Sequence, residues 1–141
     1  MTDLQGLGSA FRRGSRWLGW ICVLIIVVLS WLPASELVRT GVNPRVEHGF
    51  AYTWAGIFLS FGYSGRRPIF QLLLGLAALA CAMELGQFFV EGRHPAVLDA
   101  FASASGGVLG SLIGVCMVVA ESQLQGKARS NPAESHDFSE S

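Results

Sequence analysis

Four long apolar stretches, separated by short polar segments, account for most of the chain. They cover residues 17–32, 48–63, 69–90 and 96–120. The first has 16 residues, which as a helix extend about 24 Å, against a hydrocarbon core of roughly 30 Å. Trp17, Trp20 and Trp31 lie near its ends, where interfacial aromatic residues are enriched. The pattern therefore predicts four transmembrane helices.

Two of these stretches allow a second interpretation. Arginines precede the first one, as in a signal peptide, but Leu32-Pro33-Ala34 is a poor cleavage site and further apolar stretches follow, so we predict an uncleaved span. The second stretch is aromatic and contains Gly49, Gly56 and Gly62. An amphipathic surface helix would need a polar face, and residues 57–61 offer almost none. A short membrane span is the preferred interpretation.

Composition agrees with a membrane protein. The 141 residues are 51% hydrophobic and 14% charged, whereas soluble domains carry about 25% charged residues. No phosphate-binding glycine loop, basic and aromatic stripe or CxxC spacing is present, so we expect no nucleic-acid partner, no cofactor and no metal. Cys22, Cys81 and Cys116 lie far apart inside apolar stretches, as structural thiols do.

Basic residues are distributed unequally between the two sides of the predicted bundle. One side has three of them, Arg39, Arg45 and Arg93, and the other has seven. The seven are Arg12, Arg13, Arg16, Arg66, Arg67, Lys127 and Arg129. Because cytoplasmic loops are enriched in Lys and Arg, both termini are predicted to be cytoplasmic. We thus expect an all-α integral membrane bundle of four transmembrane helices over 16–121, after a cytoplasmic segment 1–15 and before a disordered cytoplasmic tail 122–141.

This topology gathers polar side chains at the outer side of the membrane. The candidate ligand-binding pocket contains Glu47, His48, Tyr52, Glu84, Gln87, Arg93 and Asp99. Glu84 and Gln87 are three residues apart and His48 and Tyr52 are four apart, so each pair shares a helix face. Glu84 lies about 9 Å below the helix end. A carboxyl group at that depth must be protonated, paired or exposed to a water-filled cleft.

Most of these residues also have a purely structural interpretation. Asp99 could cap the fourth helix. Arg93 could reach lipid head groups or pair with Asp99 across the turn. His48 and Tyr52 could be interfacial residues in contact with water, and Gln87 could bond a neighbouring helix.

Small residues recur every four positions in the fourth stretch, at Ala102, Gly106, Gly110 and Gly114. This spacing lets helix backbones approach closely. We predict a helix-packing face, whose partner is either a helix of the same chain or a second copy in a homo-oligomer.

An ordered series of short motifs runs through residues 30–113. Leu32-Pro33 ends the first stretch, and Glu47-His48-Gly49-Phe50-Ala51-Tyr52 opens the second. Glu84, Gln87 and Gly92-Arg93 follow late in the third, and Asp99, Ser103, Gly106 and Gly110 open the fourth. In order and spacing the series resembles the VanZ-like family of small bacterial membrane proteins. The resemblance adds Ser103 to the candidate pocket.

The chain departs from that family at three positions. Pro44, Arg45 and Ser103 stand where the family pattern has Asp, Lys and Asn. A serine hydroxyl has fewer hydrogen-bonding groups than an Asn amide, and Glu47 could supply the missing carboxylate. The family is named for a protein associated with low-level resistance to teicoplanin. The resemblance implies a multi-pass protein of the bacterial inner membrane that acts in cell-envelope or glycopeptide-antibiotic response.

Two classes of function follow from these residues. In the first, a non-catalytic protein engages a lipid-linked or amphiphilic ligand, with Arg93 on an anionic head group and Glu84 and Gln87 orienting it. In the alternative, an intramembrane enzyme uses Glu84 or His48 as acid–base and Arg93 as anion stabiliser. The sequence shows no nucleophile with an attendant base, which favours the first. We also hypothesise that Glu84 and Arg93 are coupled, directly or through water.

Overall fold

The computed structural model describes residues 2–33, 35–36, 41–63, 66–93 and 95–130, and this part of the chain contains helices and no strands. The four α-helices are α1 (Thr2–Trp31), α2 (Pro44–Gly62), α3 (Arg66–Gly86) and α4 (Val97–Ser130). A short 3-10 helix, η1 (Gln87–Phe89), follows α3. The predicted all-α fold is confirmed.

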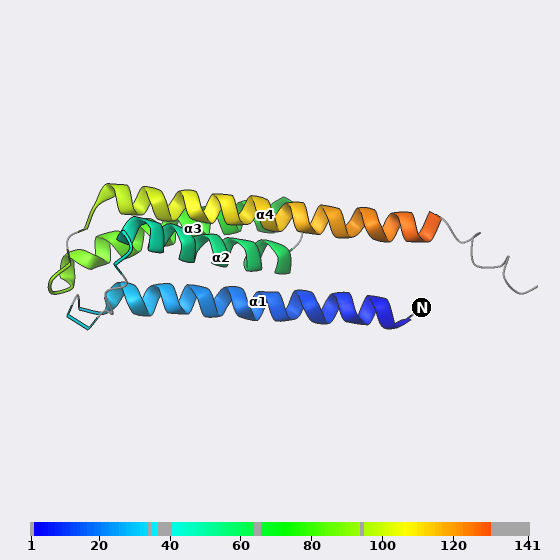
Figure 1. Ribbon diagram of the computed structural model, residues 1–141, viewed down its shortest axis with the longest axis horizontal. Helices are drawn as coiled ribbons and strands as arrows, with labels where there is room; N and C mark the ends of the chain where they lie inside the picture. Colours follow the sequence, from blue (N-terminus) through cyan, green and yellow to red (C-terminus); the bar gives the residue numbers. More distant parts are fainter. Residues whose placement is uncertain (1, 34, 37–40, 64–65, 94, 131–141) are drawn as a thin grey trace, which may run out of the picture.

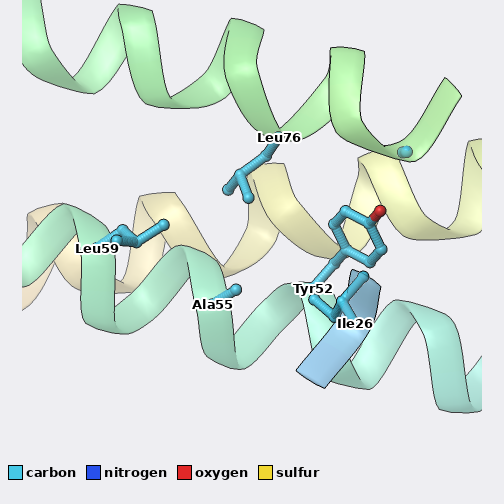
Figure 2. Close-up of a cluster of buried hydrophobic side chains, with 6 residues drawn as sticks. Ile26, Tyr52, Ala55, Leu59 and Leu76 are labelled. Carbon is cyan, nitrogen blue, oxygen red and sulfur yellow. The ribbon is translucent and has the colours of Figure 1, made fainter. Parts of the chain in front are cut away.

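Helix α2 lies at the centre of the bundle and packs against α1, α3 and α4 (Figure 1). The buried core forms where α1, α2 and α3 meet, around Tyr52 and Leu59 of α2 (Figure 2). Ile26 of α1 and Leu76 of α3 approach this core from either side. Because α2 is surrounded by other helices, it can include Gly and Ser without exposing them to lipid.

Three of the helices are long and apolar enough to cross a membrane, over Gly8–Trp31, Pro68–Phe89 and Val97–Lys127. These correspond to the first, third and fourth predicted spans. Large apolar side chains on their surfaces are exposed, including Leu24, Leu74 and Leu112. Such surfaces are costly in water and suited to lipid. Helix α2 is not among the three.

Glycines bring α2 and α4 into backbone contact. A Cβ added at Gly106 would overlap the carbonyl oxygen of Gly49, and one at Gly110 would overlap that of Thr53. At Gly114 the Cβ would lie 2.7 Å from the carbonyl oxygen of Ile57. The small-residue face of the fourth helix therefore packs on α2 of the same chain.

Two predicted boundaries differ from the structure. The tail was predicted to be disordered from residue 122, but α4 continues to Ser130. Extending an existing helix requires no new nucleation, and Gln125 Nε2 donates to Glu121 Oε1 (3.2 Å) across one turn. Residues 131–141 and Arg39 lie outside the described residues. The third helix ends at Gly86 rather than near Val90, and the chain turns where Gly92 adopts φ +72°.

Helices α1 and α3 run in the same direction, and α2 and α4 run in the opposite one (Figure 1). The ends of α1 and α3 meet, because a Cβ at Gly86 would lie 3.3 Å from the Trp31 ring. We call this end of the bundle, where α1 and α3 finish and α2 and α4 begin, the distal end. The opposite end, where α2 finishes and α3 begins, is the proximal end.

Candidate functional site

All eight candidate pocket residues lie in the distal half of the bundle. Glu47, His48 and Tyr52 are in the first half of α2, and Glu84 is in the last turn of α3. The others come from η1, the η1–α4 loop and the first two turns of α4: Gln87, Arg93, Asp99 and Ser103. The structure thus gathers at one end the residues that the sequence grouped on one side of a membrane.

Glu84 reaches from α3 to the beginning of α4. Its Oε2 accepts a hydrogen bond from the backbone N–H of Ala96 (2.9 Å). The carbonyl oxygen of Ala96 in turn accepts from Asp99 N (2.8 Å) and Ala100 N (3.3 Å). Because the first N–H groups of a helix have no partner within it and the helix dipole favours a negative charge there, Glu84 caps α4 from a neighbouring helix.

Arg93 has the complementary role at the end of α1. Its Nη2 donates to the carbonyl oxygen of Leu29 (2.6 Å) and its Nε to that of Leu32 (3.3 Å). These carbonyls lack partners in the helix, and a cation is favoured at a helix C-terminus. Arg93 therefore ties the loop before α4 to the end of α1.

Asp99 connects α4 to the start of α2. Its Oδ1 accepts from Arg45 Nε (2.9 Å), which makes an ion pair. Asn43 caps α2 by accepting from the N–H of Arg45 (3.0 Å), and Pro44 occupies the first turn. The partner of Asp99 is thus Arg45, not Arg93. Glu84 and Arg93 likewise have separate backbone partners, so a coupling between them would run through the loop or through water.

Three polar residues of the candidate pocket are buried beneath these contacts. Tyr52, Gln87 and Ser103 are 2%, 5% and 4% exposed. The Tyr52 side chain points from α2 towards α3 (Figure 2), the helix whose last turn carries Glu84. Among the described residues the buried Tyr52 hydroxyl has no hydrogen-bond partner, as is also true of the buried hydroxyls of Ser60 and Ser111. An unpaired buried polar group costs about 1–3 kcal/mol, and a hydrogen bond to a ligand atom or a water molecule would offset that cost.

Glu47 and His48 lie at the rim of this buried cluster. Glu47 is exposed in the first turn of α2, and His48 is half-buried. Both residues lie at the distal end of the bundle, in the first two turns of α2.

A groove in the other half of the bundle was not foreseen from the sequence. It has a volume of about 430 Å³ and lies over α2, between α1 and α3. Trp20 and Val23 of α1, Leu59 and Tyr63 of α2, and α3 between Pro68 and Leu79 line it. The one related feature of the sequence is Gly75, a small residue in the middle of an apolar span, which does not by itself indicate a groove.

Among the described residues, no group of three or more His, Cys, Asp or Glu side chains could hold a metal ion. Comparisons with known protein families, with curated proteins and with solved structures give no match to this chain. The function has to be argued from the site itself.

Proposed function

We propose that the protein is a non-catalytic, multi-pass protein of the bacterial inner membrane that binds a lipid-linked or amphiphilic envelope molecule at its distal end. The observation that carries the proposal is the buried Tyr52 hydroxyl, which has no hydrogen-bond partner among the described residues and points towards α3, the helix that carries Glu84. The resemblance to the VanZ-like family supports the cellular setting, the cell envelope and its response to glycopeptide antibiotics.

We propose that α2 also crosses the membrane, which gives four spans with both termini cytoplasmic. Helices α1 and α3 point in the same direction and meet at the distal end. If both cross the bilayer, the chain must return between them, and α2 is the described helix available for that return. Its modest hydropathy is compatible with a span because its neighbours, rather than lipid, cover most of its surface.

We call Tyr52, Glu84 and Gln87 the distal cluster. Together they offer a defined set of hydrogen-bonding groups. The Tyr52 hydroxyl can donate and accept, Gln87 can do both through its amide, and the carboxyl group of Glu84 has a second oxygen beyond the one bonded to Ala96. These groups suit a ligand with hydroxyl or amide groups. Arg93 and Arg45 lie at the same end of the bundle and would attract a phosphate or carboxylate. The lipid tail would contact the apolar surface of the helices.

A Tyr52→Phe variant tests this function. Removing an unpaired buried hydroxyl should leave the protein as stable or more stable, whereas ligand binding should weaken by roughly tenfold, as expected for loss of one hydrogen bond of about 1.4 kcal/mol. The full-length protein, purified in detergent, would be titrated with a polyprenyl phosphate and a polyprenyl-diphosphate sugar by native mass spectrometry. Unchanged affinity for both, or no binding by the unaltered protein, would contradict the proposal.

The alternative is an intramembrane enzyme in which Glu84 or His48 acts as acid–base and Arg93 stabilises an anion. The observation in its favour is that Glu84 is on α3, the helix towards which the buried Tyr52 hydroxyl points. The same incubation with lipid-linked precursors would separate the two functions. A product seen by mass spectrometry that disappears in Glu84→Gln would establish the enzyme, whereas saturable binding without turnover supports the binding protein.

A further inference from the structure

The groove between α1 and α3 is a second candidate site, separate from the distal cluster. Its volume of about 430 Å³ is within the range of roughly 300–1,000 Å³ found for small-molecule sites. Val23, Leu59, Leu76 and Leu79 make its wall almost entirely hydrocarbon. A Cβ added at Gly75 would meet no atom within 4 Å, so the groove is open along α3. Such a lining suits a hydrocarbon chain.

A polar cluster forms the proximal boundary of this groove. Trp20 Nε1 donates to Tyr63 Oη (3.2 Å), and the Arg16 guanidinium lies 4.8 Å from the centre of the Tyr63 ring. Arg16 Nε donates to the carbonyl oxygen of Gly62 (2.8 Å), which fixes the orientation of the guanidinium while engaging one of its five N–H donors. Arg16, Trp20 and Val23 share one face of α1. Arg16 is exposed. It therefore places a positive charge on α1 next to the residues of that helix that line the groove.

Further basic residues are close to this boundary in the sequence. Arg12 and Arg13 are on the same segment of α1, and Arg66 and Arg67 directly precede Pro68, which lines the groove. Glu121 neutralises Arg12 through an ion pair (3.1 Å). An apolar groove that leads to basic residues matches an amphiphile with an anionic head and a hydrocarbon tail.

We propose that this groove binds one acyl chain of an anionic phospholipid from the proximal leaflet, with the phosphate held by Arg16. With cytoplasmic termini, that leaflet is the inner one. A second copy of the chain is the competing occupant. A parallel two-fold dimer through the groove would bring Arg16 of both copies to the same end of the interface, and like charges repel. A lipid phosphate instead neutralises them.

Two substitutions on α3 distinguish lipid binding in the groove from lipid binding elsewhere on the apolar surface. Gly75→Leu fills the groove at a position with open space. Ala78→Leu adds similar bulk one turn further along α3, at an exposed position outside the groove lining. Arg16→Gln removes the cation. The full-length protein in detergent would be titrated with dioleoyl phosphatidylglycerol and, as the neutral control, dioleoyl phosphatidylcholine, and bound lipid counted by native mass spectrometry.

The unaltered protein is expected to bind phosphatidylglycerol more tightly than phosphatidylcholine. Gly75→Leu and Arg16→Gln should each weaken phosphatidylglycerol binding by roughly tenfold or more, as loss of one charged or well-buried contact does. Ala78→Leu should bind as the unaltered protein does. Tyr52→Phe should also leave this affinity unchanged, which separates a failure here from a failure of the distal site.

Lipid chains brominated on their carbon atoms give a second measurement. In a variant that retains Trp20 as its sole tryptophan, brominated phosphatidylglycerol should quench Trp20 fluorescence, and Gly75→Leu should reduce that quenching. If both lipids bind equally and Gly75→Leu has no effect, the bound lipid lies on the general surface of the helices and not in the groove. That result would overturn the proposal. A dimer that Gly75→Leu dissociates would also overturn it, because the groove would then hold a second copy.

Discussion

Two charged side chains at the distal end are bonded to backbone groups at the ends of other helices. Glu84 accepts from Ala96 N at the start of α4, and Arg93 donates to Leu29 and Leu32 at the end of α1. Helix ends leave N–H and C=O groups without partners, and each unsatisfied group in hydrocarbon costs several kcal/mol. These two residues therefore hold the distal end together and also shape the cluster around Tyr52.

The hydrogen bond of Glu84 can be measured with two uncharged replacements. Glu84→Gln keeps a side-chain oxygen for Ala96 N–H, whereas Glu84→Met has similar length and no acceptor. Because neither replacement carries a charge, the difference in stability between the two variants measures the hydrogen bond to Ala96 N–H. We expect Glu84→Met to be less stable by about 1 kcal/mol. Thermal unfolding in detergent, followed by circular dichroism, provides the measurement. Equal stability of the two variants would mean that the Glu84 bond contributes nothing to α4.

At the scale of elements, the packing of α2 on α4 depends on glycines of α4, which have no side chain to hold the two backbones apart. Gly106 and Gly110 allow the α4 backbone to contact the carbonyl groups of Gly49 and Thr53. Close backbone approach is how helices in lipid gain packing energy, since lipid tails are as apolar as the side chains they replace. The central position of α2 rests on this face.

A methyl group at this face should disrupt the packing. Gly110→Ala is expected to destabilise the protein by roughly 1–3 kcal/mol, because the added Cβ overlaps a backbone carbonyl that cannot rotate away. Gly75→Ala is the matched control, since the same methyl group meets open space there and alanine favours helix by up to about 1 kcal/mol. Unfolding temperatures in detergent should move in opposite directions. A loss in Gly75→Ala as large as that in Gly110→Ala would refute the packing argument.

At the scale of the molecule, the direction of the helices constrains how the chain can lie in a membrane. With α1 and α3 parallel and α2 and α4 antiparallel to them (Figure 1), four crossings put both termini on one side. Three crossings, with α2 left outside the bilayer, would put them on opposite sides. The basic residues favour the cytoplasm for the proximal end.

Cysteine labelling distinguishes these topologies. In a background with alanine at Cys22, Cys81 and Cys116, single cysteines would replace Ser35 in the α1–α2 loop and Gln123 near the end of α4, both exposed. A membrane-impermeant thiol reagent added to intact cells should label position 35 and not position 123. Labelling at both positions would indicate three crossings, and labelling at 123 alone would reverse the orientation. Permeabilised cells, in which both should react, provide the control.

Periodicity and local chemistry determined much of this protein from the sequence alone. The apolar stretches predicted an all-helical fold with four spans, and three of the four helices are long and apolar enough to cross a membrane, since helix length and hydropathy are properties of each segment. The four-residue spacing of Gly106, Gly110 and Gly114 predicted a packing face for the same reason. Chain direction predicted that Glu84, Arg93 and Asp99 would lie at one end of the bundle.

Only the tertiary structure decided what those residues touch. The sequence could not show that Gly110 packs on Thr53, that Asp99 pairs with Arg45, or that Glu84 bonds to Ala96 N–H. It also could not reveal the groove between α1 and α3. The physical reason is that such contacts depend on which helices are neighbours and on their rotation about their axes. Hydrophobic patterning, nearly uniform around helices that face lipid, leaves that rotation undetermined.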